Sequence, residues 1–123
     1  MLTHGPPHDI LDKTDRDEAV GCKFLRHAVK RVRPLLHCFG HIHEGYGAQK
    51  INWEKNTIET ATPNKGKSLL NRSNHLPCSS DGPEPLVFGE ETIFVNASIM
   101  NSNYRPVNAP WLVDLDLPIR AEG

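Results

Sequence analysis

Alternating apolar and polar stretches divide the chain into short segments typical of an α/β layer. The apolar run 35–39, bounded by Pro34 and Gly40, predicts a short buried strand. Before it, apolar residues recur at helical spacing across 18–33, and Pro34 would end that helix. Helix, proline, strand and loop form a half-unit of an α/β layer, so we expect the helix to cover one face of the strand.

Further extended segments follow this half-unit. Residues 48–53 and 57–60 flank a polar turn and predict a hairpin, while 91–97 and 111–117 predict two later strands. Residues 64–85 are rich in Gly, Ser, Asn and Pro and predict a flexible loop or insertion. Neither repeats nor a second domain are visible, so the chain is expected to be one α/β unit.

Composition narrows the class of protein. With 123 residues, the chain is large enough for a single core but small for an enzyme with a two-metal site. A net charge of -1 with scattered basic residues gives no nucleic-acid footprint. We expect no membrane span and no signal peptide. An odd count of 3 cysteines at irregular spacing predicts free thiols in a reducing compartment, the cytoplasm.

The candidate chemistry lies directly after the predicted strand 35–39. His41 and His43 stand on the loop at its carboxyl end, where α/β sheets place their sites. Neutral imidazole is the commonest metal-binding side chain, so two of them on a turning backbone can face one ion or two adjacent ions. On spacing alone, such a pair is more often two solvated or hydrogen-bonded histidines than a metal site. The preceding strand and the glycines on both sides of the pair bring the two interpretations to about equal weight.

Three motifs in order carry a resemblance to a known family. These are Thr-His-Gly-Pro-Pro at 3–7, Gly-His-Ile-His at 40–43 and Val-Asn-Ala-Ser at 95–98. Together they resemble the calcineurin-like metallophosphoesterases, in particular the branch of small metallophosphoesterase domain proteins. The resemblance covers most of the chain and implies part of a β-sandwich flanked by helices, over residues 1–123. It also implies hydrolysis of a phosphate ester with two divalent ions, for which manganese, iron and zinc are not distinguished.

The family's site can be carried over to five residues of this chain. By resemblance, His4 matches the family's separate histidine, and His41 and His43 match the Gly-His-x-His pair. His4 and His41 would then bind one ion and His43 the other. Gly40 would let the backbone approach the site, and Asn96 would support the ligands without binding metal.

The departures from the family pattern are large. None of the family's DxH, GDxxD and GNH[DE] motifs occurs in the 123 residues. The chain therefore resembles only the C-terminal half of the domain, and its start is expected to be cut. Without the bridging carboxylate, we expect weak metal binding and little or no hydrolysis. The alternative is a non-catalytic remnant that binds a metal or a partner, with self-association through an exposed sheet edge.

Other polar residues receive less specific predictions. His8 is a candidate contact to substrate, whereas His27 and His37 are expected at the edge of the core or on the surface. The acidic residues of 9–18 are expected in a solvated loop or at a helix start. His75 and Cys78 have the spacing of half a zinc knuckle, but no second pair follows.

Overall fold

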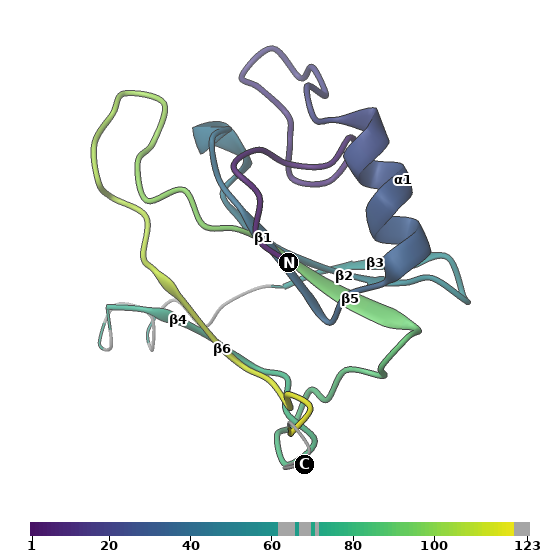
Figure 1. Ribbon diagram of the computed structural model, residues 1–123. Coiled ribbons are helices and arrows are strands. Elements are labelled where there is room, and N and C mark those ends of the chain that lie inside the picture. The colour runs from purple at the N-terminus through teal and green to yellow at the C-terminus, as the bar shows by residue number, and fades with distance from the viewer. Residues whose placement is uncertain (62–65, 67–69, 71, 120–123) are drawn as a thin grey trace.

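The fold is mixed α/β, as the sequence predicted (Figure 1). The computed structural model describes residues 1–61, 66, 70 and 72–119. The larger sheet has the order β1-β5-β2-β3, with β1 parallel to β5 and the other neighbours antiparallel. Its strands are β1 (Leu36–Phe39), β5 (Glu91–Asn96), β2 (Gly47–Asn52) and β3 (Thr57–Thr60). The smaller sheet pairs β4 (Asn74–Pro77) in parallel with β6 (Trp111–Asp114).

Strand β5 is the centre of the molecule because both of its faces are covered. All six of its residues are buried. Phe94 faces a core cluster that contains Val29 of the helix α1 (Lys23–Val32). Ile93 and Val95 face a second cluster with residues of the smaller sheet. Figure 1 accordingly shows α1 on one side of the larger sheet and the β4–β6 pair on the other.

The helix begins later than the predicted range 18–33. Gly21 lies so close to the preceding loop that a Cβ there would be 2.3 Å from the carbonyl oxygen of Pro7. Extended backbone therefore continues to Cys22, whose sulfur accepts a hydrogen bond from the amide of Leu25 and caps the helix. At the other end, Arg33 adopts a left-handed conformation and terminates α1 before the proline, as predicted.

Strand β4 lies inside the segment that was predicted as a flexible loop or insertion. Asn74 and Pro77 are poor strand formers, so local sequence provides little sign of it. The strand is held instead by parallel pairing with β6 and by Leu76, which is buried between the sheets. Parts of the predicted loop, namely 64–65, 67–69 and 71, lie outside the described residues. Strand β6 is also shorter than the predicted 111–117.

The N-terminal residues extend the larger sheet and position His4. Leu2 forms a parallel bridge with Cys38 of β1, and the amide of Thr3 donates to the Cys38 carbonyl at 3.1 Å. The amide of Gly40 then donates to the carbonyl of His4 at 2.9 Å. The two histidine motifs therefore leave the sheet side by side. Among the described residues, no helix is long and apolar enough to cross a membrane.

Candidate metal centre

His4 and His41 converge at the carboxyl end of β1. His4 Nε2 lies 3.1 Å from His41 Nδ1, and the ring centroids are 4.7 Å apart. Both side chains are exposed to solvent. The structure thus brings together two of the three histidines that the sequence singled out, across 37 positions of the chain.

The backbone of the Gly-His-Ile-His segment turns sharply between its histidines. His41 has a φ of 67°, in the left-handed region that few residues other than glycine adopt. The amide of Ile42 donates to the Gly40 carbonyl at 2.8 Å. A Cβ on Gly40 would lie 3.3 Å from the Ser98 hydroxyl, so the glycine leaves room for the segment that follows β5. The turn directs His41 toward His4, and His43 opens the short 3-10 helix η1 (His43–Gly45).

His43 is held by a different part of the chain. Its Nδ1 donates to the carbonyl of Asn101 at 3.2 Å, and its ring packs edge-on against Tyr104 at 5.5 Å. This bond leaves Nε2 with the lone pair, the arrangement common in metal-binding histidines. Within the described ranges, however, no group of three or more His, Cys, Asp or Glu side chains is placed to hold a metal. His43 as a ligand therefore stays a prediction.

Asn96 links three segments beneath the histidines. It is fully buried at the end of β5. Its Nδ2 donates to the carbonyls of Leu11 at 3.1 Å and Ile42 at 2.9 Å, while its Oδ1 accepts from the amide of Ser98 at 3.1 Å. Since Ile42 stands between His41 and His43, the Asn96 side chain fixes the backbone that carries both rings.

The histidine pair has a spacing compatible with one metal ion. Two nitrogens bound at about 2.05 Å lie about 2.9 Å apart at a right angle and about 3.3 Å apart at a tetrahedral angle. The observed 3.1 Å falls between these values. Without metal, the same distance is a hydrogen bond in which one ring donates and the other accepts. The pair therefore fits two positions of a coordination sphere, and the remaining ligands have to come from elsewhere.

Asp12 differs from the solvated acidic residue that was expected. It is buried, and its Oδ2 accepts from the amides of Asp9 at 3.0 Å and Gly21 at 2.7 Å. His8 lies beside it, with 3.8 Å between Nδ1 and the same oxygen. The carboxylate organises the loop before α1, because unpaired amides in a buried loop are costly. The structure places His8 with this loop and not with the histidine pair.

Sequence reasoning missed several residues around the histidine loop. Gly45 is one: a Cβ there would lie 2.1 Å from the Leu11 carbonyl oxygen. Its signal was the glycine-rich exit of the motif. Asn101 and Tyr104 could not have been found, because they reach His43 across nearly half of the chain's span.

His75 and Cys78 do not form a metal site with each other. His75 Nε2 lies 2.6 Å from the Asp114 carboxylate on β6, and Cys78 is buried in the cluster between the sheets.

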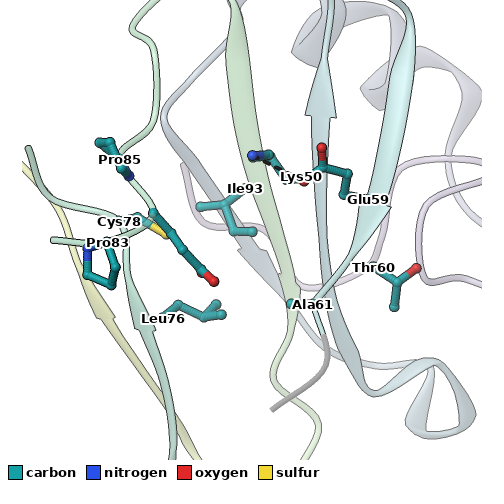
Figure 2. A pocket seen from close by; sticks show the side chains of 10 residues that line it. Lys50, Glu59, Thr60, Ala61, Leu76, Cys78, Pro83, Pro85 and Ile93 are labelled. Atoms are coloured by element: carbon teal, nitrogen blue, oxygen red, sulfur yellow. Dashed lines mark ion pairs between the residues drawn. The ribbon is translucent and has the colours of Figure 1, made fainter. Parts of the chain in front are cut away.

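A cleft of about 380 Å³ opens between the two sheets (Figure 2). Lys50 of β2 projects into it and pairs with Glu59 at 3.2 Å and Glu91 at 3.4 Å. Burial by itself lowers the pKa of Lys50, but the bonds and charges of the two carboxylates outweigh it and raise that pKa. Lys50 is thus matched by two carboxylates, and Glu84 also lines the cleft, so the cleft carries more negative than positive charge.

Comparison with known proteins decides the relationship. No protein-family profile matches the chain. Metallophosphoesterase domain-containing protein 1 of Homo sapiens is 35% identical over 120 residues, which is 96% of this chain and 25% of that protein. The chain is related to the metallophosphoesterases. It spans about a quarter of the length of that relative.

Two further relatives match shorter segments. UPF0046 protein K07C11.7 of Caenorhabditis elegans is 39% identical over 72 residues, covering 58% of this chain and 24% of that protein. Probable rhamnogalacturonate lyase C of Emericella nidulans is 46% identical over 56 residues, but these make up 5% of that protein. So small a share carries no argument about lyase activity. The metallophosphoesterase relationship rests on the match that covers nearly the whole chain.

Proposed function

We propose that this chain contributes part of a divalent-metal centre that serves the hydrolysis of a phosphate ester. The observation that carries the proposal is the approach of His4 Nε2 to His41 Nδ1, at a spacing that suits two ligands of one ion. The relationship to a metallophosphoesterase domain protein supports the same interpretation.

Each candidate site residue has a defined part in this proposal. His4 and His41 would hold one ion, and His43, with its lone pair on Nε2, would serve a second ion, as the resemblance implies. A divalent ion supplies a bound water of lowered pKa and a positive charge for phosphate oxygens. Asn96 and the left-handed turn at His41 hold the imidazoles in place before any ion binds.

On its own, the 123-residue chain is proposed to bind metal weakly and to lack turnover. Its sequence contains no DxH, GDxxD or GNH[DE] motif, so the carboxylate that would bridge two ions is missing. Two neighbouring cations repel, and such a carboxylate is the main offset. Imidazole ligands alone do not select among manganese, iron and zinc.

A second candidate is a metal-binding or partner-binding module without catalysis. It is favoured by the histidine pair standing without a third ligand of the usual types within the described residues. Under either candidate, we propose a cytoplasmic location, supported by the free thiols of Cys22, Cys38 and Cys78.

Calorimetric titration of the chain with Zn²⁺ and Mn²⁺, beside a phosphodiester hydrolysis assay, tests the proposal. We expect weak binding that is lost in His4→Ala and in His41→Ala, with no turnover. His27→Ala, an exposed histidine on α1, is the matched control and should bind normally. Binding that survives both substitutions would overturn the proposed centre. Turnover that a chelator and His41→Ala abolish would overturn the inactivity of the isolated chain and reject the non-catalytic module.

A further inference from the structure

A groove lined entirely by basic side chains runs along α1 from Arg26 to the C-cap residue Arg33. Its volume is about 510 Å³, and we call it the basic groove; it is lined by Arg26, His27, Lys30, Arg31 and Arg33. None of these residues belongs to the histidine pair or its supports. The groove is therefore a separate feature, and a ligand bound there would be independent of the proposed function.

The basic groove is more than the polar face of an amphipathic helix. Lys30 and Arg31 lie in the last turn of α1, where cations complement the helix dipole, and this is their ordinary explanation. The helix dipole does not account for Arg26, which lies one turn earlier in α1 and is partly buried. Helical spacing of 26 with 30 and of 27 with 31 gathers the cations on one side, while Val29 points into the core.

The charges of the basic groove are nearly uncompensated. In the described part of the chain, Arg33 has an acidic partner, Glu54, and no ion pair involves the other four lining residues. This contrasts with Lys50 in the cleft between the sheets, which faces two carboxylates. The whole chain has a net charge of -1, so the positive charge is concentrated here and not general.

Arg26 supplies a second, independent sign of a ligand. Its guanidinium lies over the Trp53 ring, with Cζ 5.3 Å from the centroid. Its Nη1 is buried and has no hydrogen-bond partner in the structure. A buried donor without an acceptor is costly, and because Arg26 also lines the groove, an anion bound there is a candidate acceptor for its guanidinium.

We propose that the basic groove binds a small polyanion of the phosphate class, such as a pyrophosphate group. Its volume is within the range of small-molecule sites, about 300 to 1,000 Å³. Guanidinium groups match phosphate oxygens with paired hydrogen bonds, and Lys30 adds a point charge. A nucleic acid would need a basic track beyond the groove, which the scattered basic residues elsewhere do not supply.

Titration with pyrophosphate, followed by two-dimensional NMR of backbone amides and indole groups, tests this proposal. The chain is first treated with a chelating resin, so that no ion at His4 or His41 can recruit phosphate. We expect shifts concentrated in 26–33 and at the Trp53 indole. Binding should weaken strongly between about 0.05 M and 0.5 M salt, because screening acts on exposed charges.

Charge reversal provides the decisive comparison. The double substitution Lys30→Glu with Arg31→Glu, at two exposed positions, should weaken pyrophosphate binding by about tenfold or more. Lys23→Glu makes the same kind of change on the same helix outside the groove and should change the affinity by about twofold or less. The amide spectrum without ligand reports whether each variant folds. Shifts spread evenly over distant lysines, or unchanged binding in the double variant, would overturn the proposal, as would the absence of binding at low salt.

Discussion

At the scale of single residues, His37 differs from the exposed pair His4 and His41 because its side chain lies in the core. The sequence predicted His37 at the edge of the core or on the surface, but the residue is fully buried in β1, with edge-on ring contacts to Phe39 and Phe94. The Thr3 hydroxyl donates its proton to the Gly5 carbonyl, so His37 Nε2 must donate to that hydroxyl, and Nδ1 remains a buried acceptor without a partner. Burial, helped by the positive N-terminal amino group, lowers the pKa of His37 to about 4.

This lowered pKa predicts an acid-sensitive fold. The unfolded chain takes up the His37 proton near pH 6.5, whereas the folded chain resists it down to about pH 4. Stability from this group is therefore full above pH 6.5 and falls as the pH drops toward 4. At about 1.4 kcal/mol per pKa unit, the total loss is about 3 kcal/mol. Urea unfolding at several pH values between 5 and 7 gives the free energy of unfolding as a function of pH. This free energy should change clearly less with pH in His37→Leu than in the natural chain.

A control for this comparison is His27→Leu, which alters an exposed histidine on α1. Its free energy of unfolding should depend on pH as in the natural chain. The same pH dependence in the natural chain and in His37→Leu would show that His37 is not held neutral by its burial.

Asn96 predicts a large loss of stability on truncation. Asn96→Ala removes three hydrogen bonds and leaves the partly buried carbonyls of Leu11 and Ile42 without this donor. We expect the free energy of unfolding to fall by about 2 to 4 kcal/mol. Asn103→Ala, on the exposed loop, should change it by less than about 0.5 kcal/mol. Similar values for both variants in chemical denaturation would contradict the bracing role of Asn96.

The sequence singled out His4 and His41, but it did not predict which residues contact Asn96 and His43. His4 and His41 were brought together because ordered motifs resemble a known site, not because spacing alone demanded it. The partners of Asn96 lie 85 and 54 positions away, so only the folded chain reveals them. His43 illustrates the limit: its motif position suggested a ligand, while its contacts with Asn101 and Tyr104 depend on a loop with no recognisable pattern.

At the scale of elements, the short helix η1 should tolerate no side chain at Gly45. Gly45→Ala would place a Cβ 2.1 Å from the Leu11 carbonyl oxygen and 2.9 Å from Asn96 Nδ2, so backbone must move. We expect a loss of about 2 to 4 kcal/mol and altered amide shifts around 41–46. Gly5→Ala is the matched control because nothing lies within 4 Å of its added Cβ. A Gly45 variant as stable as the Gly5 variant would refute this contact.

Element boundaries were predictable where local pattern decides them and not where distant contacts do. The range 35–39 was correct to one residue for β1, because proline and glycine bound an apolar run. The beginning of α1 was wrong, because Gly21 is held extended by the loop that contains Pro7 and Asp12. Strand β4 was missed, since its pairing with β6 joins residues nearly forty positions apart.

At the scale of the whole molecule, the outer edge of β3, which no other strand among the described residues pairs with, predicts self-association. All four residues of β3 are exposed, and the strand ends the order β1-β5-β2-β3. A strand at the edge of a sheet that carries an exposed apolar side chain, here Ile58 at 57% exposure, can pair with another chain. Light scattering after size exclusion should show a concentration-dependent dimer. Ile58→Lys should weaken it by about tenfold or more, whereas Leu117→Lys, an exposed residue beyond β6, should not. A monomer at all concentrations would contradict this edge pairing.

The central claim is that two histidines from distant motifs form one ligand pair. Its most direct test is a Zn²⁺ titration of histidine-labelled chain, read from the NMR shifts of the ring nitrogens. We expect His4 Nε2 and His41 Nδ1 to take the shifts of metal-bound nitrogens together, while the rings of His27 and His75 stay unchanged. Zinc-dependent shifts at His27 or His75, with His4 and His41 unaffected, would contradict it.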